Sequence, residues 1–253
     1  MLTKTSQKDK ILQVASFIPK ALGALPTVTL VVATRLSKNE FLVNSPTGKS
    51  IAFYKKYPAN FGTIVRLANK RGLPEVYNEA IDSTEDDSTV LVFAHDDLYF
   101  YDFLWVEKIV AGLKDFDIVG LAGNVRRVPN QPSWAFVNDK FEWDAKSNLS
   151  GTVGHGHGFP PKNLSKFGVA PQKVKLLDGL LIATTKATLK KSKLRFDPQF
   201  DFHFYDLDFC RQAEVLGLTC GTLPISITHA SGGSTKSESW RSGYRKYLAK
   251  WGS

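Results

Sequence analysis

The chain has 253 residues and a formal net charge of +9, from 33 Lys and Arg against 24 Asp and Glu. Hydrophobic residues make up 43% of it, too many for a disordered protein, and the length suits one large α/β domain or two small ones. Two cysteines, Cys210 and Cys220, exclude a disulfide framework and a cysteine-based zinc site, and they indicate a reducing compartment. No apolar stretch approaches the roughly 20 residues of a transmembrane helix.

The positive charge points to an anionic partner, which can be nucleic acid, a membrane surface or a phosphorylated small molecule. Basic residues are scattered singly or in pairs, however, as on an ordinary solvated surface. No nucleic-acid recognition motif is present, so we expect no nucleic-acid partner. We expect a cytoplasmic protein, with peripheral contact at the inner face of a membrane as the alternative.

Residues 1–26 carry a broken apolar pattern, interrupted by Gln13, Pro19 and Lys20, which fits a secretory signal poorly. We interpret this segment as a loosely attached leader. An amphipathic helix that docks on the body or on a membrane surface is the alternative interpretation.

Strand and helix signals alternate along the first half of the chain. Continuous apolar, β-branched runs predict strands buried on both faces, and apolar residues three and four apart predict helices. The expected elements are strands at 27–33, 62–67, 89–94 and 117–122, and helices at 73–81 and 104–113.

The second half is less regular. Residues 125–172 are rich in Pro, Gly, Asn and Trp, and we expect a long irregular stretch there. Strands are then expected at 174–183 and 219–228, with a helix at 205–216 between them and a basic, aromatic tail after them. The whole pattern predicts an α/β fold with a mostly parallel sheet and a ligand crevice at the carboxyl ends of its strands.

Two adjacent carboxylates, Asp96 and Asp97, follow the apolar strand at 89–94. Neighbouring carboxylates at a strand end repel each other unless water or a cation compensates them. Mg²⁺ and Mn²⁺ bind one or two carboxylates together with phosphate oxygens. The alternative is an ordinary polar turn after a strand, and the local sequence does not decide between the two.

Five motifs stand in the order that one known family has them. They are the strand at 27–33 with Thr34-Arg35, the segment at 69–80, the turn Ala94-His-Asp-Asp-Leu98, the pair formed by Leu177-Asp178-Gly179 and residues 204–209, and the segment at 227–240. Each is a weak signal alone. Together they resemble the family-2 glycosyltransferases, which have the GT-A fold, and the resemblance covers residues 27–251.

The resemblance implies a nucleotide-sugar donor, most plausibly a UDP-sugar, and a Mn²⁺ or Mg²⁺ cofactor. Asp97 and His229 correspond to metal ligands, and Asp96 lies near the ribose or the metal. The first position of the motif is His95 rather than Asp, which leaves the ribose contact open. A nitrogen ligand such as His229 tilts the choice toward Mn²⁺. Without the resemblance, we would interpret His229 as a hydrogen-bonded histidine at a strand end.

The resemblance also implies an inverting transfer, in which a base takes the proton of the acceptor hydroxyl. Asp206 and Asp208 are the candidates, and the family alignment favours Asp206. Residues two apart on a helix face opposite sides, so only one of them is expected to reach the crevice. Helix capping is the alternative role for both. Tyr205 stands where many relatives have Glu.

Donor and acceptor binding divide the chain at about residue 124. Residues 27–124 are expected to form the nucleotide-sugar half, and residues 125–253 the acceptor half of the same compact domain. The acceptor is a glycan, a lipid-linked sugar or a protein. The residues expected to bind the donor are Thr34, Arg35, Asn69, Arg71 and Asp96, and those on the acceptor side are Asp178, Gly179 and Trp134.

Two further patterns carry weaker signals. The run Gly154-His-Gly-His-Gly158 has no acidic or cysteine partner at zinc-site spacing, so we interpret it as an acceptor-facing loop. The run Ser45-Pro-Thr-Gly-Lys-Ser50 matches the second half of a phosphate-binding loop but lacks its first glycine, because Val43 occupies that position. We treat it as a chance match. An ATP- or GTP-binding protein, or an inactive GT-A-like binding module, remains the alternative function.

Overall fold

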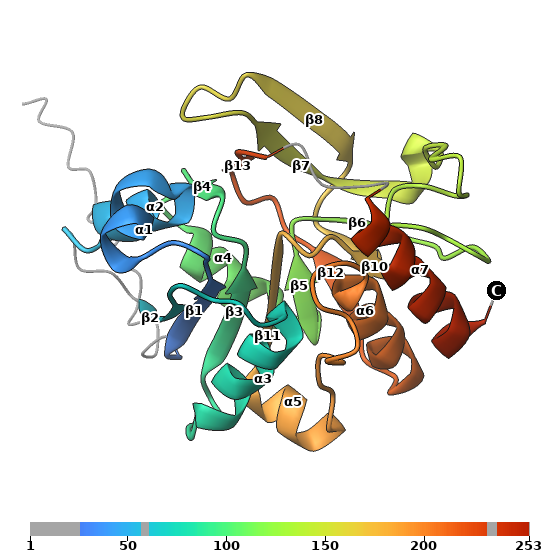
Figure 1. Ribbon diagram of the computed structural model, residues 1–253, viewed down its shortest axis with the longest axis horizontal. Helices are drawn as coiled ribbons and strands as arrows, with labels where there is room; N and C mark the ends of the chain where they lie inside the picture. The colour runs from blue at the N-terminus through green and yellow to red at the C-terminus, as the bar shows by residue number, and fades with distance from the viewer. Residues whose placement is uncertain (1–25, 57–60, 232–236, 253) are drawn as a thin grey trace, which may run out of the picture.

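The computed structural model describes residues 26–56, 61–231 and 237–252 (Figure 1), so the expected leader lies almost entirely outside the described residues. No helix among them is long and apolar enough to span a membrane. The strands are β1 (Val28–Ala33), β2 (Phe61–Arg66), β3 (Val90–Ala94), β4 (Leu98–Phe100), β5 (Ile118–Gly120), β6 (Ala122–Asn124), β7 (Leu149–His155), β8 (Asn163–Gly168), β9 (Gln172–Val174), β10 (Leu176–Leu177), β11 (Leu181–Thr185), β12 (Cys220–Thr222) and β13 (Ile227–His229). The helices are α1 (Lys38–Asn44), α2 (Pro46–Tyr54), α3 (Leu73–Ser83), α4 (Trp105–Gly112), α5 (Lys186–Ser192), α6 (Tyr205–Val215) and α7 (Glu238–Trp251), with a 3-10 turn η1 (Lys146–Asn148).

The main sheet has the order β2-β1-β3-β11-β5-β12-β9. Strands β2, β1, β3, β5 and β12 run in one direction, and β11 and β9 run in the other. Because β11 is antiparallel to β3, Leu181 at its start pairs with Ala94 at the end of β3. Residues just before β11 therefore lie at the same edge of the sheet as residues just after β1 and β3. The predicted α/β class with a mostly parallel sheet is confirmed.

A second, smaller sheet has the order β10-β6-β7-β13-β4, with β8 paired to β7. It begins where the chain leaves the main sheet, since Leu98 follows the turn after β3 and Ala122 follows β5 after one residue. Strand β13 lies between β7 and β4, and His229 pairs in register with Leu98. This register places the end of β13 beside the start of β4.

Helices flank the main sheet. Helix α3 is amphipathic and packs its Tyr77 ring against Phe93 of β3, at a centroid distance of 4.9 Å. Tyr77 also contacts Tyr205 of α6 at 5.9 Å, so α3 and α6 lie side by side on one face, while α4 lies behind the sheet in Figure 1. Burial of this apolar surface is the main stabilising contribution to the fold.

Three predicted strands are wrong because each is divided between elements. Where one strand is expected at 174–183, the structure has three short strands, β9, β10 and β11. The chain turns tightly between β10 and β11, where the Leu180 N–H donates to the side chain of Asp178. The expected strand at 219–228 divides into β12 and β13 around Pro224, which has no N–H to donate. The strand at 117–122 divides into β5 and β6 at the buried Leu121.

One stretch predicted as irregular, and the tail for which no element was predicted, contain regular structure. The long hairpin of β7 and β8 occupies the end of the 125–172 stretch. The basic, aromatic tail is helix α7, whose buried Trp240 and Tyr247 hold it against the body. Ser237 caps this helix, because its hydroxyl accepts the Trp240 N–H at 3.1 Å.

Candidate active site

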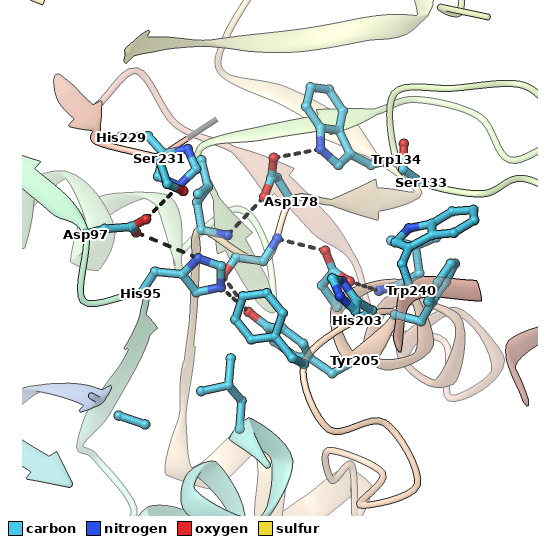
Figure 2. A pocket seen from close by; sticks show the side chains of 18 of the residues that line it. His95, Asp97, Ser133, Trp134, Asp178, His203, Tyr205, His229, Ser231 and Trp240 are labelled. Carbon is cyan, nitrogen blue, oxygen red and sulfur yellow. Dashed lines mark hydrogen bonds and ion pairs between the residues drawn. The ribbon is translucent and has the colours of Figure 1, made fainter. Parts of the chain in front are cut away.

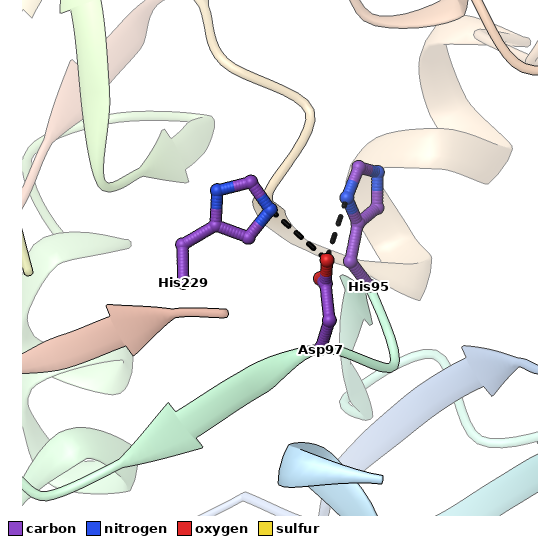
Figure 3. Close-up of side chains that lie close together, drawn as sticks. All are labelled: His95, Asp97 and His229. Atoms are coloured by element: carbon purple, nitrogen blue, oxygen red, sulfur yellow. Dashed lines mark ion pairs between the residues drawn. The ribbon is translucent and has the colours of Figure 1, made fainter. Parts of the chain in front are cut away.

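The turn after β3 carries three polar side chains, His95, Asp96 and Asp97, and the end of β13 brings His229 to it (Figure 3). Asp97 Oδ2 lies 3.1 Å from His229 Nε2. Asp97 Oδ1 lies 4.0 Å from His95 Nδ1, too far for a hydrogen bond. Two imidazoles from different sheets thus face one carboxylate, with a gap between His95 and that carboxylate.

These three residues fit a divalent cation. One ligand atom from each of His95, Asp97 and His229 lies within 4.8 Å of the others. Asp97 Oδ1 is among the buried side-chain oxygens without a hydrogen-bond partner in the described chain. A buried carboxylate oxygen without a partner is costly in an empty site and is satisfied by a bound cation. A mixed nitrogen and oxygen donor set favours Mn²⁺ over Mg²⁺.

The protonation states suit metal binding. Burial raises the pKa of Asp97, but the hydrogen bond and charge of His229, together with His95, outweigh burial and lower this pKa to about 2. Burial lowers the pKa of His95, which favours the neutral ring. An ionised carboxylate and a neutral imidazole are the forms that bind metals.

Tyr205 fixes the orientation of the His95 ring. Its hydroxyl donates to the Gly179 carbonyl at 2.7 Å and lies 3.0 Å from His95 Nε2. The hydroxyl has only one hydrogen, so Nε2 of His95 is the donor in the second contact. The lone pair of Nδ1 then faces Asp97, as expected of a metal-binding histidine whose other nitrogen donates a hydrogen bond. The family motif did not assign His95 as a ligand, and the geometry places it with Asp97 and His229.

The residues expected on the acceptor side, among them Asp178 and Trp134, lie next to this cluster (Figure 2). Trp134 Nε1 donates to Asp178 Oδ2 at 2.7 Å. Gly179 has no room for a side chain, because a Cβ there would lie 2.4 Å from the Tyr205 hydroxyl. The Gly179 N–H donates to Asp206 Oδ2 at 2.9 Å. Asp178, Gly179, Trp134 and Asp206 therefore line one hollow together with Asp97 and His229.

Asp206 stands at the start of α6, where a strained backbone turn directs it into this hollow. Phe204, the residue before the helix, has a φ of 69° in the left-handed region, and its ring stacks against Tyr244 of α7. Burial, followed by the negative charge of Asp178, raises the pKa of Asp206 to about 7. Such a carboxyl group is half ionised near neutral pH, which suits a general base.

Asp208 lies in different surroundings and is not among the residues that line this hollow. It is fully buried and binds α7: Oδ1 accepts from Trp251 Nε1 and lies next to Lys250 Nζ, both at 2.7 Å. Gln212 Nε2 donates to its other oxygen. The structure therefore gives Asp208 an anchoring role beneath α7, in place of the catalytic role for which the sequence made it a candidate.

Replacing Asp208 with asparagine is expected to lower the free energy of unfolding by about 2 kcal/mol, because it removes a charge-assisted bond to Lys250. Urea denaturation followed by circular dichroism measures this. The matched control is Glu238→Gln, which breaks an exposed ion pair with Arg245 within α7 and is expected to leave the free energy of unfolding near that of wild type. Equal effects of the two variants would contradict the anchoring role.

The residues expected to bind the donor line a second hollow, which adjoins the first at Ala33, Asp96 and Phe202. Thr34 is buried at its rim, and Asn69 fixes the loop after β2 by bonding the backbone of Arg71 in both directions. These residues are Thr34, Arg35, Asn69, Arg71 and Asp96, and all five face the same space. Their contacts with a donor remain predictions.

Sequence reasoning missed part of this hollow. Helix α7 contributes Ser239, Ser242 and Lys246, and the loop before α6 contributes Phe202, whose ring stacks on His95 at 5.6 Å. The aromatic residues of the tail recur three and four apart from Trp240 to Trp251, which is the signal of a helix and would have revealed α7. Among the cations that line this hollow, Arg71 is tied to Glu79 at 2.6 Å and Lys246 Nζ donates to the Gln199 carbonyl at 2.9 Å, and Arg35 lines it too.

Comparisons with known proteins agree with this architecture. Residues 50–233 match a glycosyltransferase-like family, and the chain belongs to that family. No curated protein matches the chain. The α/β architecture with a mostly parallel main sheet, which the resemblance implies, is the one observed.

Similar solved structures include GalNAc-T7, a Drosophila galactosyltransferase and S. aureus TarS. GalNAc-T7 with UDP, GalNAc and Mn²⁺ is 10% identical, with a TM-score of 0.48, over 88% of this chain and 48% of that one. The catalytic domain of Drosophila β1,4-galactosyltransferase 7 with xylobiose is 12% identical, with a TM-score of 0.46, over 87% and 79%. S. aureus TarS is 12% identical, with a TM-score of 0.44, over 81% and 60%. The chain spans about half the length of the GalNAc-T7 chain.

Proposed function

We propose that the protein is a metal-dependent, inverting glycosyltransferase that moves a sugar from a nucleotide diphosphate donor, UDP first among the candidates, to an acceptor hydroxyl. One observation carries this proposal: a carboxyl group with a pKa of about 7, Asp206, shares a hollow with the metal-binding set of His95, Asp97 and His229. Membership of a glycosyltransferase-like family supports it.

Asp206 accepts the proton of the acceptor hydroxyl as the new bond to the anomeric carbon forms and the bond to the diphosphate breaks. The Gly179 and Leu207 N–H groups hold its two oxygens in place, each at 2.9 Å. His95, Asp97 and His229 would hold a divalent cation, which would supply positive charge to stabilise a departing diphosphate. The configuration at the anomeric carbon of the sugar inverts, because in a single displacement the acceptor attacks from the side opposite the leaving group.

The side chains proposed to bind the acceptor combine aromatic rings with a carboxylate. Trp134 and Trp240 line the hollow with Asp178 and offer apolar surface beside a carboxylate, a combination that suits a sugar ring and its hydroxyls. A glycan, free or linked to lipid or protein, is the proposed acceptor. The cytoplasmic location and contact with the inner face of a membrane remain predictions.

The packing of residues 45–50 argues against the alternative function, an ATP- or GTP-binding protein. Ser45, Thr47 and Gly48 are buried at the start of α2, and the Gly48 N–H already bonds Ser45 Oγ. The run follows helix α1 and not a buried strand. It therefore leaves no open cradle for phosphates.

Calorimetry with UDP and Mn²⁺ against ATP and Mg²⁺ tests the proposed function, followed by a thermal-shift screen of UDP-, GDP- and dTDP-sugars. We expect UDP with Mn²⁺ to bind and Lys49→Ala to leave that binding unchanged, because Lys49 is exposed outside both hollows. Preferential ATP binding that Lys49→Ala abolishes would overturn the transferase proposal. Tight UDP binding without turnover of any UDP-sugar would favour an inactive binding module.

A further inference from the structure

Helix α2 is fastened to the free edge of strand β4 by a row of side-chain hydroxyls. The other edge of β4 pairs with β13. Ser50 Oγ accepts the Phe100 N–H at 3.0 Å, and the Tyr54 hydroxyl donates to the Asp102 carbonyl at 3.0 Å. Thr47 begins the row at Leu98. Hydroxyls at positions 47, 50 and 54 lie on one face of a helix, and they meet Leu98 and Phe100 of β4 and then Asp102, two residues beyond the strand.

Thr47 also reaches beyond β4 to the turn that carries the metal-binding side chains. Its side chain is fully buried, and its hydroxyl donates to the His95 carbonyl at 2.8 Å and accepts the Leu98 N–H at 3.1 Å. The hydroxyl therefore bridges the two ends of the turn. The Thr47 N–H donates to the Asp96 carbonyl at 3.2 Å, and Ser45 Oγ donates to the same oxygen at 2.5 Å.

The remaining backbone groups of the turn are held from the other side. The Asp97 carbonyl accepts the Ala230 N–H at 2.9 Å, and the His95 N–H donates to the Leu180 carbonyl at 3.1 Å. The three carbonyls of the turn are thus all fixed, and Ser45 and Thr47 hold two of them. Asp97 Oδ2 contacts His229 Nε2 at 3.1 Å, but Oδ1 has no hydrogen-bond partner among the described residues, so the position of Oδ1 depends on the backbone of this turn.

Packing explains the rest of the run that resembles a phosphate-binding loop. A Cβ on Gly48 would lie 1.9 Å from the Phe41 carbonyl oxygen of α1, so only glycine allows the two helices to cross this closely. Lys49 points outward and is exposed. Each of Ser45, Thr47, Gly48 and Ser50 therefore has a structural task in the absence of any phosphate.

We propose that Thr47, supported by Ser45, is a positioning residue for the metal site: its hydroxyl sets the turn so that His95 and Asp97 face His229 at ligand distance. The proposal rests on the metal site of the proposed function. Groups that orient metal ligands through hydrogen bonds change metal affinity without touching the ion, so the consequence is measurable in the absence of donor or turnover.

The test measures Mn²⁺ affinity by electron paramagnetic resonance on the full chain without donor. Thr47→Val removes the hydroxyl at nearly constant volume and is expected to weaken Mn²⁺ binding about tenfold. Thr47→Ser keeps the hydroxyl, and its Mn²⁺ affinity is expected to stay within about twofold of wild type. Ser50→Ala is the matched control: it removes the next hydroxyl of the row, bonded to Phe100, and leaves the turn untouched. Both Thr47→Val and Ser50→Ala are expected to lower Tm. Ser45→Ala, a milder change at the Asp96 carbonyl, serves if Thr47→Val does not fold, and it too is expected to weaken Mn²⁺ binding.

The outcomes distinguish failure of the positioning role from failure of the proposed metal site. Weaker Mn²⁺ binding in Thr47→Val with normal binding in Ser50→Ala supports the positioning role. Equal losses in both, or wild-type affinity in Thr47→Val, would show that the hydroxyl row serves stability alone. No Mn²⁺ binding by the wild-type chain would instead overturn the metal site, and the positioning role with it.

Discussion

Replacing Asp206 with asparagine is expected to lower kcat for sugar transfer about 10²- to 10⁴-fold, the range for loss of a general base. Asparagine keeps the size of the side chain but cannot accept the acceptor proton. Donor and Mn²⁺ binding should stay near wild type, because Asp206 is bonded to Gly179 and Leu207 and not to the metal cluster. Steady-state kinetics together with calorimetric donor binding measure the two effects separately.

The pH profile gives a second readout of the same group. The pKa of Asp206 is raised to about 7, so below this pH the carboxyl group is protonated and cannot act as a base. We expect kcat/KM to fall about tenfold per pH unit below that pKa and to level off above it. Asp97, with a pKa of about 2, stays ionised throughout that range. Asp206→Asn should lack this limb.

Asp208→Asn is the matched control for Asp206→Asn. The two carboxylates are two residues apart on α6, but Asp208 lies beneath α7 with Lys250 and Trp251. At a temperature where both variants are folded, Asp208→Asn should keep the wild-type pH limb. Activity retained by Asp206→Asn and lost by Asp208→Asn would reverse the assignment of the base.

The parts of the site that lie at strand ends could be predicted from sequence. Long apolar runs locate β1 and β3, and in a parallel sheet the residues that follow such strands share one edge. Thr34 and Asp96 therefore fall beside one hollow, as expected. The antiparallel β11 adds Asp178, which precedes it in the chain, to the same edge. Motif order was informative here because it follows the topology of the sheet.

The strands of the second sheet could not be predicted from the periodicity of the sequence. Its strands β6 and β13 have three residues each, too few to show a period, and β7 contains Gly151 and Gly154, which weaken strand propensity. Gly151 has a φ of 103°, a conformation open mainly to glycine, and a Cβ there would meet the Leu121 carbonyl. These glycines serve close strand contacts, which appear only once the chain is folded.

The roles of His95 and Thr47 were also hidden, for a different reason. Each depends on a partner far along the chain: Tyr205 orients the His95 ring, and Thr47 bonds a turn about 50 residues away. Local spacing contains no information on such pairs. The half-match to a phosphate-binding loop shows the converse, since hydroxyls and a glycine required by packing on β4 and α1 reproduced a ligand-binding pattern by coincidence.

Replacing Asp97 with alanine is expected to weaken Mn²⁺ binding by about 100-fold or more, beyond the range of about 10- to 100-fold typical for residues that only orient ligands. The change removes the one carboxylate of the cluster and leaves the imidazoles of His95 and His229, without the negative charge that attracts a divalent cation. Mn²⁺ titration without donor measures the loss, and turnover of a UDP-sugar with Mn²⁺ measures its consequence. Asp115→Ala, at an exposed carboxylate outside both hollows, is the control and should match wild type.

The result for Asp97→Ala also decides how the charge of the leaving diphosphate is stabilised. If the metal is required, turnover falls with Mn²⁺ affinity and a chelator abolishes it in the wild type. If turnover survives both Asp97→Ala and the chelator, the metal assignment is wrong, and cations of the protein must stabilise the diphosphate. Arg35 and Lys246, which line the second hollow and come from far apart in the chain, are then the groups whose replacement should stop the reaction.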